Sequence, residues 1–89
     1  MYKKTVTISN KSGLHARPAS LFVEHAKNFS SEVFVAKPGS IQVNAKSILG
    51  ILSLGVNKGS TIEISAQGPD AEEAVNELVK FIETFNADS

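Results

Sequence analysis

Two kinds of hydrophobic periodicity alternate along the 89-residue chain. Apolar and polar residues alternate with a period of two over residues 5–8 and 61–66, and this pattern predicts β-strands. Over residues 16–29 and 71–85 apolar residues recur every three or four positions, which is typical of amphipathic helices. The apolar positions are Ala16, Ala19, Phe22, Val23, Ala26 and Phe29 in the first predicted helix, and Ala71, Ala74, Val75, Leu78, Ile82 and Phe85 in the second.

Local signals mark the ends of the two helices. We expect the first helix to end near Asn28. Asp70 follows a proline and precedes Glu73 by three residues, so Asp70 and Glu73 predict a capping box at the start of the last helix.

The middle of the chain predicts a hairpin followed by a short helix. Strands over 32–37 and 41–44 flank Pro38-Gly39, a pair that favours a type II turn. The segment KSILGILSLG, residues 46–55, predicts a short helix with Ser47 at its N-cap.

These elements follow the order β-α-β-β-α-β-α within one domain, residues 1–89. Strands with one polar face favour an antiparallel sheet that is covered on one side only. We therefore predict an α+β fold: an open-faced β-sandwich with a four-stranded antiparallel sheet and three helices on one face.

The short helix carries more apolar side chains than one buried stripe needs. Ile48, Ile51 and Leu52 could face the sheet, but Leu49 and Leu54 are then in excess. Such a surplus in a small two-layer domain indicates an exposed apolar patch, which usually marks a docking surface.

Composition excludes several classes of protein. The chain has no cysteine, which rules out disulfides and thiolate metal sites and fits a reducing cytoplasm. We find neither a signal peptide nor the roughly 20 consecutive apolar residues of a membrane span, so we expect a cytoplasmic protein without membrane insertion.

Charge is unevenly distributed along the chain. Residues 1–58 contain eight Lys or Arg and two Glu, a net charge of +6, whereas residues 59–89 contain one Lys and seven acidic residues, a net charge of −6. Two solvated faces would explain this, and so would a basic surface around His15 that attracts an anionic partner. Nucleic acid is disfavoured, because Phe22, Phe29 and Phe85 fall on the helix stripes and Phe81 near one, whereas RNA-binding sheets display aromatic side chains on their strands.

His15 falls where the first strand gives way to the first helix. Pro18 suits the first helical turn, so we place His15 at or next to the N-cap. The free amides of Ala16 and Arg17, the helix dipole and the Arg17 guanidinium together form an anion site, and the same field favours a neutral, nucleophilic imidazole. A group that accepts a phosphoryl and holds it as phosphohistidine fits this arrangement.

Other interpretations of His15 stay open at this stage. It could simply cap the helix, with Arg17 as a surface charge. A metal site is disfavoured because His25, which we expect on the helix surface, would lie more than two turns away. A serine hydrolase would need a carboxylate to orient the imidazole, and acidic residues near His15 are few. An acylphosphatase-like hydrolase would need a well-placed side-chain amide, which we do not find.

The stretch Gly-Leu-His-Ala-Arg-Pro-Ala at 13–19 resembles the active-site signature of the HPr family, the histidine-containing phosphocarriers of the bacterial sugar phosphotransferase system. Residues 46–55 resemble the second characteristic stretch of that family. The resemblance implies a carrier, not an enzyme, that needs no cofactor. His15 would accept a phosphoryl group on Nδ1 from phosphorylated enzyme I and pass it to IIA domains of sugar permeases, with Arg17 and the amides of Ala16 and Arg17 stabilising it.

The resemblance also implies regulation and docking. Ser47 matches a serine that a kinase/phosphorylase modifies in carbon catabolite regulation, where transcriptional regulators read it. Purely regulatory relatives can lack the histidine, and a nitrogen-type phosphocarrier stays an alternative. We expect a monomer that docks its partners through Leu14, Ser20, Lys27, Lys46, Ile48, Leu49, Ile51 and Leu52.

Overall fold

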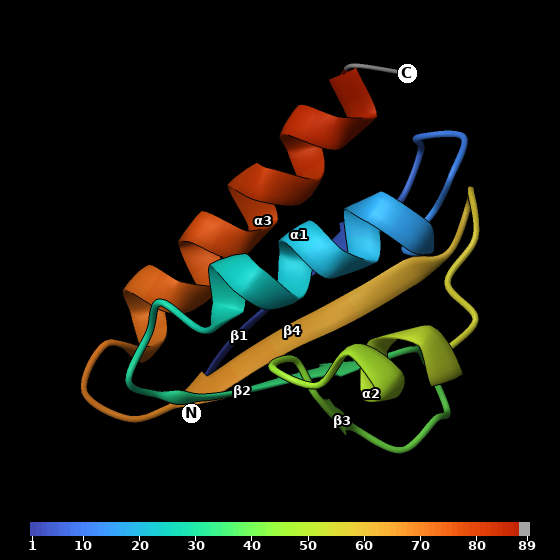
Figure 1. Ribbon diagram of the computed structural model, residues 1–89. Coiled ribbons are helices and arrows are strands. Elements are labelled where there is room, and N and C mark those ends of the chain that lie inside the picture. The colour runs from blue at the N-terminus through green and yellow to red at the C-terminus, as the bar shows by residue number, and fades with distance from the viewer. Residues whose placement is uncertain (88–89) are drawn as a thin grey trace.

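The computed structural model describes residues 1–87 and contains seven elements in the predicted order (Figure 1). They are β1 (Tyr2–Thr7), α1 (Ala16–Ala26), β2 (Glu32–Ala36), β3 (Val43–Asn44), α2 (Ile48–Ser53), β4 (Thr61–Gln67) and α3 (Ala71–Ala87).

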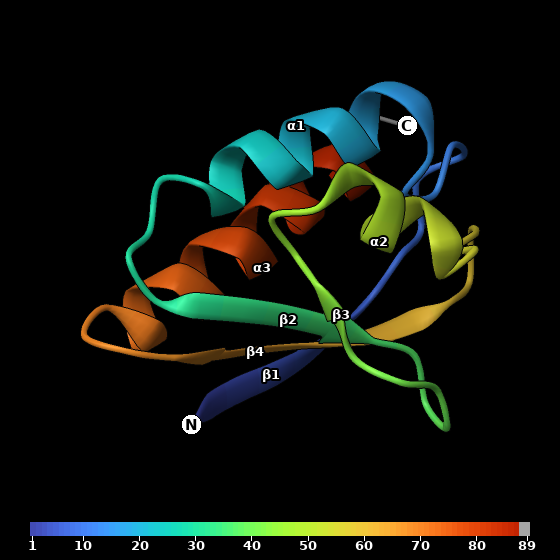
Figure 2. The ribbon, with the colours of Figure 1, turned by 60° about the horizontal axis from the view of Figure 1, so that its bottom comes forward.

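The four strands form one antiparallel sheet in the order β1-β4-β2-β3. Figure 2 shows all three helices on one face of this sheet and no helix or strand of residues 1–87 over the other. The predicted open-faced sandwich is therefore confirmed.

A single hydrophobic core lies between the sheet and the helices. Ile62 and Ile64 of β4 are fully buried opposite Phe22 of α1 and Leu78 of α3, which are also fully buried. Each such side chain contributes roughly 1.5–3 kcal/mol of transfer free energy. His25 is half-buried and stacks on Phe81 with 5.1 Å between ring centroids, so its predicted surface position is wrong.

All four strands differ in length from the prediction, β2 and β4 by one residue and β1 and β3 by two. β1 starts at Tyr2, because the backbone of residues 2–7 pairs with 61–66 along its whole length. Lys4 interrupts the alternation of apolar and polar residues in the sequence, because it is a charged residue on the same face of the sheet as Ile64. Its ammonium lies 6.0 Å from the Tyr2 ring centroid.

Strand β3 is only two residues long. The Pro38-Gly39 turn forms as predicted, with Gly39 at φ +79° and the Ser40 amide donating to the Lys37 carbonyl at 2.9 Å. Ile41 is highly exposed and lies before β3, so it belongs to the turn region rather than to the strand.

Asp70 has a different role from the capping box that we predicted. Its carboxylate accepts hydrogen bonds from the Ser30 amide and from the amide and hydroxyl of Ser31. These two serines lie in the α1–β2 loop, directly before β2. The Asp70 amide in turn donates to Ser31 Oγ at 3.1 Å. The carboxylate therefore joins the start of α3 to the start of β2.

The pKa of Asp70 lies below its ordinary value, chiefly because the Ser31 hydroxyl and the Ser30 amide donate to the charged carboxylate. A lowered folded-state pKa stabilises the fold above the unfolded-state pKa, and this stability is lost as pH falls. We expect urea unfolding of Asp70→Asn to show a shallower loss of stability below about pH 4 than the parent. Glu72→Gln, an exposed neighbour, is the control, and identical acid profiles for Asp70→Asn and parent would contradict this role.

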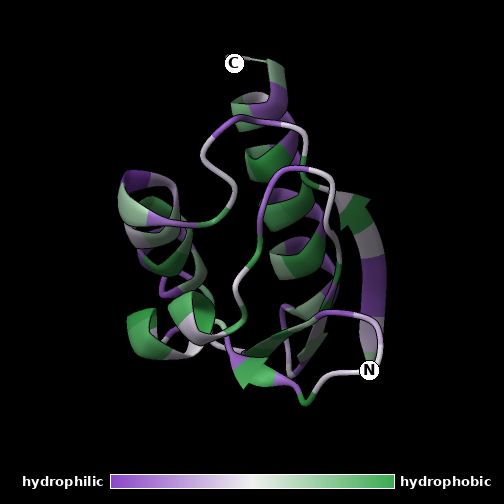
Figure 3. Ribbon diagram, turned by 90° about the vertical axis from the view of Figure 1, so that its right-hand side faces the viewer, coloured by the Kyte–Doolittle hydropathy of each residue, from purple (hydrophilic) through white to green (hydrophobic). Residues whose placement is uncertain are grey.

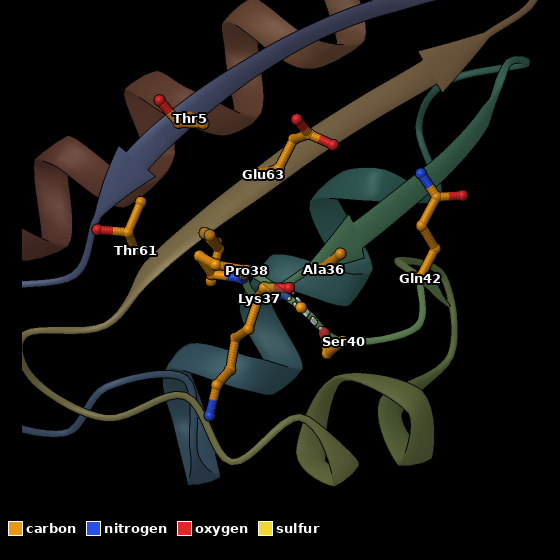
Figure 4. A pocket seen from close by; sticks show the side chains of 10 residues that line it. Thr5, Ala36, Lys37, Pro38, Ser40, Gln42, Thr61 and Glu63 are labelled. Carbon is orange, nitrogen blue, oxygen red and sulfur yellow. Dashed lines mark hydrogen bonds between the residues drawn. The ribbon is translucent and has the colours of Figure 1, made fainter.

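The open face of the sheet carries a hollow of about 360 Å³ (Figure 4). Thr5, Thr61 and Glu63 line it from β1 and β4, and Lys37 and Ser40 line it from the β2–β3 turn. None of its lining residues belongs to the His15 segment. Within residues 1–87, no helix is long and apolar enough to cross a membrane.

Candidate functional site: the His15 loop and the α1–α2 surface

His15 is the N-cap residue of α1, as predicted. Its backbone is extended, with φ −127° and ψ 162°, and its own side chain makes no capping hydrogen bond. Within residues 1–87 the backbone amides of Ala16 and Arg17 make no hydrogen bond. Two unpaired donors at the positive end of a helix dipole are suited to bind an anion.

The first turn of α1 has an unusual backbone. Ala16 has φ +51°, in the left-handed region that non-glycine residues occupy at a cost of roughly 1–3 kcal/mol. Its side chain is exposed, so its predicted place on the buried stripe is wrong. Pro18 follows in the first turn and is buried, and its missing amide hydrogen removes no helical hydrogen bond there.

Gly13 packs the His15 loop directly against the loop that joins α2 to β4. It has φ +63°, and a Cβ at this position would overlap the Val56 carbonyl oxygen and lie 2.9 Å from Asn57 Cα. The next amide, that of Leu14, donates to the same Val56 carbonyl at 3.0 Å. The absence of a side chain at Gly13 thus allows residues 56–57 to lie beside His15.

Asn57 contacts the imidazole of His15, and sequence analysis missed it. The distance from His15 Nε2 to Asn57 Oδ1 is 2.9 Å. An amide oxygen only accepts, so this bond forms when Nε2 carries the hydrogen, and in the neutral imidazole the lone pair is then on Nδ1. Within residues 1–87 Nδ1 has no hydrogen-bond partner, so the free nucleophilic atom of the ring is Nδ1.

Basic groups surround this loop. Arg17 is exposed, and its guanidinium makes no ion pair or hydrogen bond within residues 1–87. Lys11 and Lys58 are exposed in the two loops that Gly13 brings together. The His15 end of the molecule therefore offers free positive charge to an anionic group.

Four of the predicted docking residues line one groove between α1 and α2. The groove has a volume of about 300 Å³, and its lining includes Ser20, Lys27, Lys46 and Ile48. Lys27 forms an ion pair with Glu24 at 3.5 Å, and the Lys46 ammonium donates to the Phe29 carbonyl at 2.7 Å.

The predicted apolar patch is confirmed on α2, whose ribbon is largely green beside α1 in Figure 3. Leu49 is 77% exposed, and Ile48 and Leu52 are 37% and 39% exposed. Two docking predictions are wrong: Leu14 and Ile51 are 1% and 0% exposed and belong to the core. Hydrophobicity alone does not distinguish the buried from the exposed side of so short a helix.

Ser47 is the N-cap of α2, as predicted. Its hydroxyl accepts a hydrogen bond from the Gly50 amide at 3.1 Å, and the residue is half-buried beside Ile48. A charge placed on this hydroxyl would lie at the edge of the apolar patch.

The family model described as "PTS HPr component phosphorylation site" matches residues 2–84. The chain belongs to the HPr family. Among its relatives is an HPr-like protein Crh of Halalkalibacterium halodurans, 49% identical over 93% of this chain and 98% of that protein. The phosphocarrier protein HPr of Vibrio cholerae is 43% identical over 97% of this chain and all of that protein.

Solved structures agree with the family assignment. The crystal structure of an HPr from Thermoanaerobacter tengcongensis is 50% identical, with a TM-score of 0.94 over 100% of this chain and 99% of that one. The open-faced sandwich is thus the fold of HPr structures, and an HPr-family protein is a phosphocarrier rather than a catalyst.

Proposed function

We propose that this HPr-family protein is a cytoplasmic carrier that accepts a phosphoryl group on His15 Nδ1 from phosphorylated enzyme I and passes it to IIA domains of sugar permeases. The observation that supports it most is the hydrogen bond from Nε2 to Asn57, which leaves the Nδ1 lone pair free at a helix N-terminus. The exposed guanidinium of Arg17 adds charge at the same place.

The chemistry needs few groups. The Nδ1 lone pair attacks phosphorus while the bond from phosphorus to enzyme I breaks, and Nε2 keeps its hydrogen throughout. The amides of Ala16 and Arg17 and the Arg17 guanidinium stabilise the charge on the phosphoryl oxygens. Transfer to a IIA domain reverses these steps, so moderate stabilisation serves a carrier better than tight binding.

The test is intact mass after incubation with phosphoenolpyruvate and enzyme I, measured again after mild acid. We expect a gain of one phosphoryl group that acid removes, as a phosphoramidate would. No gain with a demonstrably active enzyme I, or an acid-stable gain, would contradict the proposal.

A regulatory role is the second candidate. It is favoured by the exposed apolar patch beside Ser47 and by the likeness to HPr-like proteins Crh. In this role a serine kinase/phosphorylase would modify Ser47 and transcriptional regulators would bind the product. We propose it as an addition to the carrier role, because His15 and its anion site are also present in this chain.

Ser47→Asp tests the docking role of the patch. Asp and Ser are both good N-caps, so we expect α2 to persist while the added charge repels an acidic partner and hydrates its apolar contact. Affinity for enzyme I, measured by calorimetry, should fall by about 10-fold, on the order of 1.4 kcal/mol. Ser47→Asn is the neutral, cap-competent control, and equal affinities for Ser47→Asp and Ser47→Asn would contradict a charge effect.

Asn57→Ala tests the orientation of the imidazole. Loss of the Oδ1 acceptor leaves the ring free to rotate and to exchange tautomers, so we expect phosphoryl acceptance to slow by about 10-fold. Stopped-flow measurement of acceptance from phosphorylated enzyme I gives the rate. Asn28→Ala, at another exposed asparagine, is the control. An unchanged rate in Asn57→Ala would show that the hydrogen bond does not orient His15.

A further inference from the structure

The side chain of Asn86, near the end of α3, contacts the segment that follows β1. Its Oδ1 accepts hydrogen bonds from the amides of Ser9 at 2.9 Å and Asn10 at 3.2 Å. Its Nδ2 donates to the Thr7 carbonyl at 3.0 Å. One amide side chain therefore pairs three backbone groups, one in the last residue of β1 and two in the segment that follows it.

The same segment connects to Gly13 through a second asparagine. Asn10 is buried, and its Nδ2 donates to the Gly13 carbonyl at 3.2 Å. The Gly13 amide donates back to the Asn10 carbonyl at 3.3 Å. These two bonds close the loop between residues 10 and 13, so its shape depends on where Asn10 is held.

Gly13 connects the loop of residues 10–13 to the imidazole of His15. It lies against Val56 and Asn57, and Asn57 accepts the hydrogen bond of His15 Nε2. A continuous set of contacts thus runs from Asn86 to His15, although the two residues are 71 positions apart in the sequence. Figure 1 shows the red end of α3 and the blue loop after β1 at the same end of the sheet.

We propose that Asn86 is a positioning residue for His15, and that it acts through Asn10 and Gly13 by holding the loop in the one shape that aligns His15 with Asn57. This inference rests on the proposed function, because the alignment matters for phosphoryl acceptance at Nδ1. It requires that α3 set the tautomer of an imidazole that it does not touch.

The experiment compares Asn86→Ala with Asn76→Ala in the full chain. Asn76 is a matched control, since it is an asparagine of α3 that contacts the other end of β1, where it accepts from the Tyr2 hydroxyl at 3.5 Å. The ¹⁵N chemical shifts of the His15 ring report its tautomer without any phosphoryl donor. Stopped-flow acceptance from phosphorylated enzyme I reports the rate, and hydrogen exchange reports the protection of the Ser9 and Asn10 amides.

In Asn86→Ala we expect lost amide protection, a smaller fraction of the Nε2–H tautomer and acceptance slowed by about 3- to 10-fold. Asn76→Ala should leave all three unchanged, and Asn86→Asp, which keeps the acceptor oxygens, should restore part of the tautomer fraction. A parent-like tautomer and rate in Asn86→Ala, despite lost amide protection, would overturn the proposal.

Two further outcomes need their own interpretation: a variant that does not fold, and a parent protein that accepts no phosphoryl group. If Asn86→Ala does not fold, Asn10→Ser breaks the next contact of the series, and an unchanged His15 tautomer there would overturn the proposal. If the parent protein accepts no phosphoryl group, the proposed function fails, while the tautomer comparison still decides whether Asn86 positions His15.

Discussion

We expect the replacement of His15 by Ala to abolish phosphoryl acceptance from phosphorylated enzyme I and to leave the fold intact. His15 is half-buried and makes one side-chain hydrogen bond, to Asn57, at the exposed end of α1. Its removal therefore opens no core cavity, and we expect the free energy of unfolding to change by less than about 1 kcal/mol. Intact mass and urea unfolding measure the two effects independently.

His25→Ala is the matched control, because it removes the only other histidine. Its ring stacks on Phe81, so this variant should lose some stability but accept a phosphoryl group normally. Acceptance by His15→Ala, or loss of acceptance in His25→Ala with the fold intact, would contradict the assignment of His15.

Gly13→Ala is the substitution that we expect to destabilise the protein most. An added Cβ would be forced into the left-handed region at φ +63° and would overlap the Val56 carbonyl, which is backbone and cannot rotate away. Strain and overpacking together predict a loss of about 2–4 kcal/mol in the free energy of unfolding. The shift should also separate Asn57 from His15, which lowers the rate of phosphoryl acceptance in the fraction that remains folded.

Gly55→Ala separates the two causes of this loss. Gly55 has nearly the same φ, +62°, but a Cβ there would meet no atom within 4 Å. We expect it to lose only the conformational part, about 1 kcal/mol. Urea unfolding compares the two variants, and equal losses would show that close approach to Val56 does not limit Gly13.

Periodicity and capping predicted most of the architecture. The stripes of α1 and α3, the alternation of β4 and the Pro38-Gly39 turn are each local signals, and each survives in the structure. His15 and Ser47 were also predictable as N-caps, because a cap is set by its immediate neighbours.

The parts that sequence analysis missed depend on contacts between distant segments. Asn57 reaches His15 only because β1 and β4 pair and bring their adjoining loops together at Gly13. Asp70 looked like a helix cap, but Ser31, 39 positions earlier, takes its carboxylate. No fixed spacing in the sequence predicts such distant partners. The asparagine of the turn Val56-Asn57-Lys58-Gly59 could nevertheless have been noted as a polar side chain that is able to reach a neighbouring loop.

The position of the phosphoryl group on the imidazole is the decisive measurement for the carrier role. We expect it on Nδ1 of His15, because Nε2 donates a hydrogen bond to Asn57. NMR with ³¹P and ¹⁵N detection on the protein phosphorylated by enzyme I and phosphoenolpyruvate distinguishes the two ring nitrogens through their couplings to phosphorus. A coupling to Nδ1, with Nε2 still protonated, is the predicted result, and a phosphoryl group on Nε2 or on any other residue would contradict the assignment of His15 Nδ1 as the acceptor.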